Sequence, residues 1–236
     1  MSFLQPSQQR TRIKICGLTR EQDVDAAVAA GVDAVGFVLY APSPRYVASE
    51  RAFELAQRLP PFVTPVLLFV NESATKIIAT CERIPGATVQ FHGEETPADC
   101  DRIGRPYIRA ARIPMGAAGA GFDLVKYAHN YSNAQAILLD AHVDGYGGGG
   151  KAFNWSLLPP SVNSHLVLSG GLDAANVIDG ILQVRPRCKT LAVDVSSGVE
   201  ISKGIKSLEK INQFAAAVRA ADKQFAKLTH VPVPTT

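Results

Sequence analysis

Short apolar runs rich in β-branched residues alternate with segments of helical periodicity along most of the chain. A strand buried in a parallel sheet is apolar throughout, whereas a surface helix repeats its apolar residues every three or four positions. The first pattern predicts eight strands, at Arg12–Cys16, Asp33–Leu39, Thr64–Val70, Ala87–Phe91, Tyr107–Arg112, Ala134–Asp140, His165–Ser169 and Thr190–Val195. The second predicts the helices that follow them, at Arg20–Ala30, Ser49–Leu59 with Ser49 as N-cap, Ser73–Arg83, Thr96–Arg102, Asp123–His129, a turn at Trp155–Leu158, Ala174–Val184 and Lys203–Ala221.

Strict alternation of strand and helix implies parallel strands joined by right-handed crossovers. Eight such units between residues 12 and 221 predict a single-domain α/β fold, the closed (β/α)8 barrel. An open doubly wound sheet is the alternative, but no G-x-G-x-x-G motif follows the first strand. Residues 1–11 are expected to form a flexible lead and residues 222–236 a flexible tail.

Composition narrows the class of protein. The 236 residues are 47% hydrophobic and carry a formal net charge of only +3 without a cluster of cations, which argues against a nucleic-acid partner. No apolar run approaches the roughly 18 residues of a membrane span, and the first residues lack a secretory pattern. The four scattered cysteines show no metal-site spacing, so we expect reduced thiols, a cytoplasmic protein, and neither metal nor cofactor.

Polar and glycine residues are concentrated where the predicted strands end. In a (β/α)8 barrel the carboxyl ends of the strands form the active site. The loops after the seventh and eighth strands commonly bind phosphate through backbone N–H groups, and both are glycine-bearing here. The predicted phosphate-binding residues are Gly170, Gly171, Ser196, Ser197 and Gly198. Ordinary turns and helix caps are the alternative interpretation.

Two residues at these strand ends could transfer protons. Cys16 ends the first strand and is either a base or a small buried hydrophobic residue. Lys14 lies on the same strand face, where it could favour the thiolate or simply pair with Asp194. Asp140 follows a purely apolar run, which is unusual for a strand residue, and it is either an acid or a helix cap.

Two further residues could contact a substrate. The planar guanidinium of Arg45 suits a carboxylate, although the spacing alone favours a solvated loop charge. His92 is either a site residue or a turn histidine whose hydrogen bonds are satisfied locally.

Taken together, these segments resemble the phosphoribosylanthranilate isomerase family of tryptophan biosynthesis. The resemblance spans roughly residues 12 to 221 and follows the order of the family motifs. It rests on KICGLT (14–19), GFVLYAPSPR (36–45), VQFHG (89–93), LLD (138–140), GGGGKAFNW (147–155), LSGGL (168–172) and DVSSGVE (194–200).

The resemblance implies an Amadori rearrangement of N-(5-phosphoribosyl)anthranilate to 1-(2-carboxyphenylamino)-1-deoxyribulose 5-phosphate. It implies that Cys16 is the general base at the sugar C2 and that Asp140 is the general acid at the ring oxygen. It also implies that Arg45 binds the anthranilate carboxylate and that Asp194 lies near the sugar. We expect His92 to contact the substrate as well. The five residues of the glycine loops would hold the phosphate. We expect a monomer, with a dimer as the alternative.

The chain departs from the family pattern at two positions. Asn154 stands where the family usually has Asp, and Phe91 where it usually has Leu. Two other functions were considered. The histidine-pathway sugar isomerase has similar phosphate loops but an acid at the end of the first strand, where this chain has Cys16. A non-catalytic phosphosugar-binding barrel would have no use for Cys16 and Asp140 together.

Overall fold

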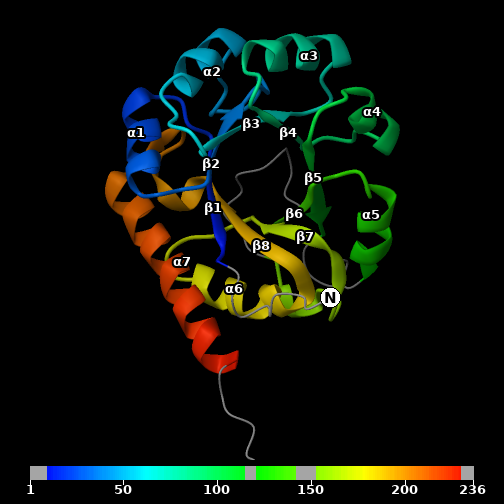
Figure 1. Ribbon diagram of the computed structural model, residues 1–236, viewed down its shortest axis with the longest axis vertical. Coiled ribbons are helices and arrows are strands. Elements are labelled where there is room, and N and C mark those ends of the chain that lie inside the picture. Colours follow the sequence, from blue (N-terminus) through cyan, green and yellow to red (C-terminus); the bar gives the residue numbers. More distant parts are fainter. Residues whose placement is uncertain (1–9, 115–120, 142–152, 230–236) are drawn as a thin grey trace, which may run out of the picture.

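A computed structural model of the protein describes residues 10–114, 121–141 and 153–229. Eight parallel strands close into one barrel in chain order, and the helices surround it (Figure 1). The strands are β1 (Arg12–Cys16), β2 (Ala34–Val38), β3 (Thr64–Phe69), β4 (Thr88–Phe91), β5 (Tyr107–Ile113), β6 (Ala136–Ala141), β7 (Val162–Leu168) and β8 (Cys188–Val195). The predicted (β/α)8 barrel is therefore confirmed, and the open sheet is excluded.

The helices of the described residues form the outer layer of the barrel (Figure 1). They are α1 (Glu21–Ala29), α2 (Ser49–Ala56), α3 (Ala74–Arg83), α4 (Pro97–Arg102), α5 (Leu124–Asn130), α6 (Val177–Val184) and α7 (Leu208–Thr229). The predicted turn between β6 and β7 is a 3-10 helix, Trp155–Leu157. No helix within the described residues is long and apolar enough to span a bilayer.

Strand alternation sorts the side chains of the barrel into an outer and an inner set. In β1, Ile13 and Ile15 are buried in the main hydrophobic core, which the helices cover. Lys14 and Cys16 occupy the other face of the strand, as the period of two requires. Lys14 lies beside Asp194 of β8 in the strand register. Lys14, Cys16 and Asp194 are therefore held inside the barrel.

Three sequence predictions differ from the structure. Ser49 is the first residue of α2 rather than its N-cap; Ala48 is the N-cap, and no side chain caps this helix end. The last helix begins at Leu208 instead of Lys203, because the chain first forms a hairpin of β9 (Glu200–Ser202) and β10 (Ile205–Lys206).

The third difference concerns the expected flexible ends. Helix α7 continues to Thr229, eight residues beyond the predicted end at Ala221, and Phe225 on this extension is buried. Thr11, placed in the expected lead, is also buried, and its N–H donates to Asp222 of α7 at 3.0 Å. Apolar burial and this hydrogen bond fix segments that composition alone indicated to be loose.

The glycine stretch 145–150 lies outside the described residues.

Candidate active site

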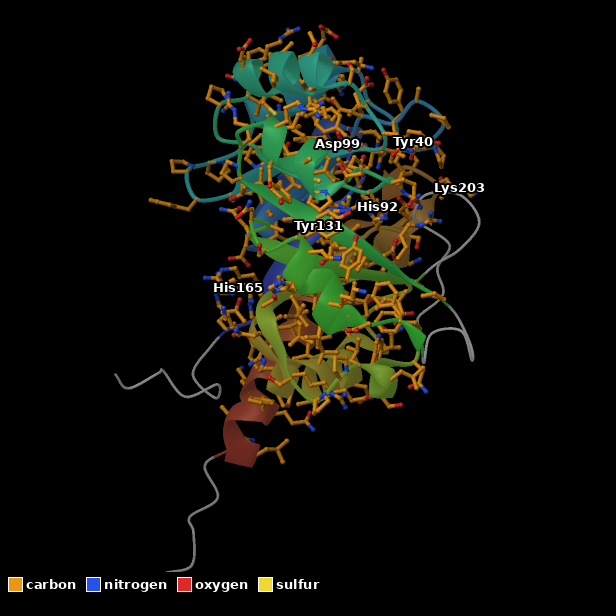
Figure 2. All side chains as sticks on the ribbon, turned by 90° about the vertical axis from the view of Figure 1, so that its right-hand side faces the viewer. Tyr40, His92, Asp99, Tyr131, His165 and Lys203 are labelled. Carbon is orange, nitrogen blue, oxygen red and sulfur yellow. The ribbon has the colours of Figure 1, made fainter. Side chains whose placement is uncertain are left out.

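A cavity opens at the carboxyl ends of the strands, where the sequence places the site. It is lined by six of the ten predicted site residues, namely Cys16, Arg45, His92, Asp140, Asp194 and Ser196. In the side view, Tyr40 and Lys203 from loops at this end lie on the right, and His165 lies on the left (Figure 2). The lining residues come from the ends of several strands spread along the chain, so only the closed barrel brings them together.

The thiol of Cys16 occupies space that a neighbouring glycine provides. Cys16 lies beside Gly36 of β2 in the strand register, and a Cβ atom on Gly36 would lie 2.7 Å from Cys16 Sγ. Burial raises the pKa of Cys16, and the charges of Lys14 and Lys206 oppose this effect without overcoming it. The thiol therefore remains largely protonated at neutral pH in the free protein.

Lys14 and Asp194 form a buried ion pair beneath this thiol. Lys14 Nζ donates to Asp194 Oδ1 at 2.8 Å, and both side chains are almost fully buried. Burial alone would lower the pKa of Lys14, but the contact with Asp194 and the proximity of Cys16 raise it. Lys14 therefore stays charged. Of the two roles considered for it, pairing with Asp194 is confirmed, and its effect on the thiol is secondary.

Asp140 contacts His92 across the cavity mouth. The two residues come from β6 and the end of β4, and both are buried. His92 Nε2 lies 3.0 Å from Asp140 Oδ2, and His92 Nδ1 lies 3.1 Å from Gln90 Nε2. His92 therefore lines the cavity with both ring nitrogens engaged, and one of its partners is the predicted general acid.

Arg45 is a buried residue rather than a solvated loop charge. Its Nε and Nη2 donate to the two carboxylate oxygens of Glu200 at 2.7 and 2.8 Å. The hairpin β9–β10 also brings Lys206 to Glu200 at 2.8 Å, and Lys206 Nζ donates to the carbonyl oxygen of Ser196 at 3.0 Å. Burial opposes the charge of Glu200, but these contacts lower its pKa overall. One carboxylate thus ties Arg45 to the loop after β8.

The two glycine-bearing loops lie side by side. Gly170 and Gly171 have φ values of +78° and +65°, a region that side chains other than glycine rarely adopt. A Cβ on Gly170 would lie 2.8 Å from Asp140 Oδ1, so this glycine also makes room for the carboxyl group. A Cβ on Gly198 would collide with the carbonyl of Leu172, so the loops can approach only if Gly198 has no side chain.

Sequence reasoning missed three residues of this arrangement: Gln90, Glu200 and Lys206. Gln90 interrupts an otherwise apolar strand and is only 1% exposed, which is a signal that the sequence did offer. Glu200 ends a recognised motif, but nothing in the sequence pairs it with Arg45. Lys206 was placed inside a helix, so its direction could not be anticipated.

Both departures from the family pattern are accommodated by the structure. Asn154 Oδ1 accepts hydrogen bonds from the N–H and hydroxyl of Ser156 at 3.1 and 2.8 Å, which a carboxylate could also do. Phe91 is buried in the core and packs edge-on against Tyr107, with ring centroids 5.5 Å apart.

A closed parallel barrel with ionisable residues gathered at its carboxyl-terminal mouth defines the class of (β/α)8-barrel enzymes. Comparison with known proteins identifies one family within this class. Residues 13–217 match the model of the N-(5'-phosphoribosyl)anthranilate (PRA) isomerase family.

Curated and solved relatives agree with that match. The N-(5'-phosphoribosyl)anthranilate isomerase of Methylibium petroleiphilum is 62% identical over 217 residues, covering 92% of this chain and 98% of the relative. A phosphoribosyl anthranilate isomerase solved with reduced 1-(o-carboxyphenylamino)-1-deoxyribulose 5-phosphate is 38% identical, with a TM-score of 0.75 over 89% of this chain and 99% of the other. Monomers derived from the dimeric Thermotoga maritima isomerase are 35% identical, with a TM-score of 0.71 over the same shares. The chain belongs to the N-(5'-phosphoribosyl)anthranilate isomerase family.

Proposed function

We propose that this protein isomerises N-(5'-phosphoribosyl)anthranilate to 1-(2-carboxyphenylamino)-1-deoxyribulose 5-phosphate in tryptophan biosynthesis. The observation that carries the proposal is the placement of Cys16 and Asp140 in one cavity. They belong to β1 and β6, which are three strands apart around an eight-stranded barrel and so nearly face each other. A solved relative that binds the reduced form of this product supports the same substrate class.

The rearrangement needs an acid and a base on different atoms of the sugar. Asp140 would donate its proton to the ring oxygen, so that the C1–O bond breaks and the nitrogen lone pair forms a C1=N double bond. Cys16, as thiolate, would then remove the proton from C2. The electrons of that C–H bond form a C1–C2 double bond and return the C=N pair to nitrogen. The enolamine becomes the ketone when its hydroxyl proton leaves and C1 gains a proton.

The remaining site residues would bind the two ends of the substrate. Arg45 lines the cavity, and Glu200 holds its guanidinium from one side, so we assign it to the anthranilate carboxylate. His92 and Asp194 line the wall where the sugar would lie. The predicted phosphate residues Gly170, Gly171, Ser196, Ser197 and Gly198 form the paired loops after β7 and β8, whose glycines allow a close backbone approach to an anion.

This chemistry requires neither a metal nor an organic cofactor. Within the described residues, no group of three or more His, Cys, Asp or Glu side chains is placed to hold a metal ion. Activity is expected to survive exhaustive chelation without added nucleotide.

The proposal is tested by supplying N-(5'-phosphoribosyl)anthranilate to the purified protein and following the loss of its anthranilate-type fluorescence. Turnover is expected with the full chain and after chelation. Folded protein without turnover would contradict the function. Binding of substrate without turnover would favour the non-catalytic phosphosugar-binding alternative, and turnover of the histidine-pathway aminoaldose alone would favour the other isomerase.

The oligomeric state and location are separate proposals. Phe62 in the loop before β3 is fully exposed and has a φ of +72°, an unusual combination for a bulky side chain. It precedes β3 at the amino-terminal face of the barrel and lines a hollow together with Leu59, Pro60 and Val63. A Thermotoga maritima relative is described as dimeric. We therefore propose a dimer through this face in place of the expected monomer, and a cytoplasmic location in keeping with four free cysteines.

Sedimentation equilibrium tests the dimer. The wild-type protein is expected at twice its chain mass, and Phe62→Glu is expected to dissociate it. Val125→Glu, which charges an exposed apolar position on α5, serves as the control and should leave the mass unchanged. A monomeric wild-type protein would contradict the proposal.

A further inference from the structure

We propose that Gln90 is a positioning residue that holds His92 in a single tautomer, with its proton on Nε2, so that His92 donates to the general acid Asp140 and cannot take its proton. The proposal rests on the function proposed above for Asp140. Gln90 lies in β4, two residues before His92, and its side-chain amide contacts His92 Nδ1.

The tautomer follows from the hydrogen bonds. The side-chain nitrogen of Gln90 can only donate, so His92 Nδ1, 3.1 Å away, must accept and carry no proton. The single proton of a neutral imidazole then lies on Nε2, which donates to Asp140 Oδ2 at 3.0 Å. A proton on Nδ1 would set two donors against each other.

An unpaired oxygen of Gln90 indicates that the amide is retained for its contact with His92. Gln90 is among the least exposed side chains of the cavity wall. Its Oε1 atom is buried and has no hydrogen-bond partner in the described structure. A buried acceptor without a partner destabilises a protein, and an apolar side chain of similar size would avoid that loss. A residue that served only to fill space would not be expected to keep the amide.

The fixed tautomer has a direct chemical consequence at Asp140. An imidazole is more basic than a carboxylate, so an unprotonated Nε2 facing Asp140 would draw away the proton intended for the ring oxygen. With Nε2 already protonated, the proton of Asp140 stays available to the substrate. Once that proton has been delivered, the N–H of His92 stabilises the carboxylate that remains.

Other ionisable groups face the same space and must be considered in any pH measurement. They are Cys16 from β1, Tyr40 and Arg45 from the loop after β2, Asp140 from β6 and Asp194 from β8. Lys14 and Glu200 pair with two of these, Asp194 and Arg45, and so contribute fixed charges nearby.

The test is ¹⁵N NMR of the imidazole nitrogens in the full-length protein without substrate. The His92 signals are assigned from the spectrum of His92→Gln. A proton on Nε2 and a bare Nδ1 are expected near neutral pH. In Gln90→Met, which has similar length but no amide, the ring should populate both tautomers. In Gln90→Glu, a carboxylate facing Nδ1 can accept a hydrogen bond, so the Nδ1 signal should show a bound proton. A proton on Nδ1 in the wild-type protein would overturn the proposal, whether or not either variant folds.

Kinetics supply a second readout. Gln90→Met is expected to lower kcat roughly tenfold with little change in KM, the size of effect that follows when one hydrogen bond to a positioned group is lost. If Gln90 acts only through His92, the same change in a His92→Gln background should cost nothing further. Losses that multiply would refute the positioning role. The NMR result does not depend on turnover, so a protein inactive towards N-(5'-phosphoribosyl)anthranilate would refute the proposed function while leaving the tautomer measurable.

Discussion

The thiol of Cys16 lies in surroundings that change its pKa in opposite directions. Burial raises the pKa and Asp194 adds to this, whereas the ammonium groups of Lys14 and Lys206 lower it, and burial prevails. A cysteine of raised pKa gives a smaller fraction of thiolate at neutral pH, but each thiolate is a stronger base for a carbon-bound proton. The sequence offered Lys14 as a group that favours the thiolate; in the structure its charge only moderates the effect of burial.

This balance predicts the titration of the thiol. The thiolate absorbance is measured against pH for the wild-type protein and for Cys16→Ser, and the difference between the two curves reports Cys16. The midpoint of this difference should lie above the ordinary thiol pKa of about 8.5. Lys14→Met removes a positive charge, so it should move the midpoint higher still. Cys81→Ser, which changes a buried cysteine outside the cavity, serves as the control. It should leave the midpoint of the Cys16 titration unchanged. A midpoint below the ordinary value would contradict the assignment of burial as the dominant effect.

At the scale of elements, the short hairpin β9–β10 links two parts of the site. It carries Glu200 and Lys206, which hold Arg45 on one side and the backbone of Ser196 on the other. Arg45 and the loop after β8, which we assign to the carboxylate and phosphate of the substrate, are therefore connected through one buried carboxylate.

Neutralising Glu200 should disturb both Arg45 and the loop after β8. Glu200→Gln leaves Arg45 and Lys206 as buried cations without a counterion, which typically costs about 3–5 kcal/mol of stability. A large fall in the urea midpoint and a higher KM are expected. Glu54→Gln removes an exposed partner of Arg51 and should change stability by less than about 1 kcal/mol. Equal effects of the two substitutions would show that the hairpin carboxylate has no special role.

The contact between the loops after β7 and β8 gives a second prediction at this scale. Gly198→Ala places a methyl group against the carbonyl of Leu172, and the loops must separate to accept it. The KM for substrate and the inhibition constant of inorganic phosphate should both rise, by roughly tenfold for the loss of one anion contact. Gly86→Ala, where the added atom meets nothing within 4 Å, is the matched control. Unchanged phosphate inhibition in Gly198→Ala would remove this loop from the phosphate site.

For the whole molecule, the barrel could be predicted because its strands and helices have distinct periodicities. Every predicted strand overlaps an observed one, since apolar β-branched runs such as Thr64–Phe69 leave little choice of conformation. The hairpin escaped prediction because its strands are only 3 and 2 residues long and Ile201 is exposed, so no period can be read from them. The length of α7 was missed because its last turns are fixed by contacts with residues near the amino terminus.

Residues that line the cavity could be predicted from the sequence, but the contacts between them could not. Cys16 and Asp140 could be located because polar or reactive residues stand out at the ends of apolar strands. The pairing of Arg45 with Glu200 joins residues 155 positions apart, and no local pattern records it. The role of Gln90 depends on which atoms of an amide and an imidazole face each other, which requires coordinates.

The most direct measurement is kcat and KM of Cys16→Ser and Asp140→Asn for N-(5'-phosphoribosyl)anthranilate, beside the wild-type enzyme. Serine is far less acidic than cysteine, and asparagine cannot deliver the proton that the ring oxygen needs. Each variant should therefore lose about 10²–10⁴ in kcat, with KM changed only modestly. If Cys16→Ser keeps more than about a tenth of the wild-type kcat, well inside that expected loss, the thiol is a packing group and the base lies elsewhere.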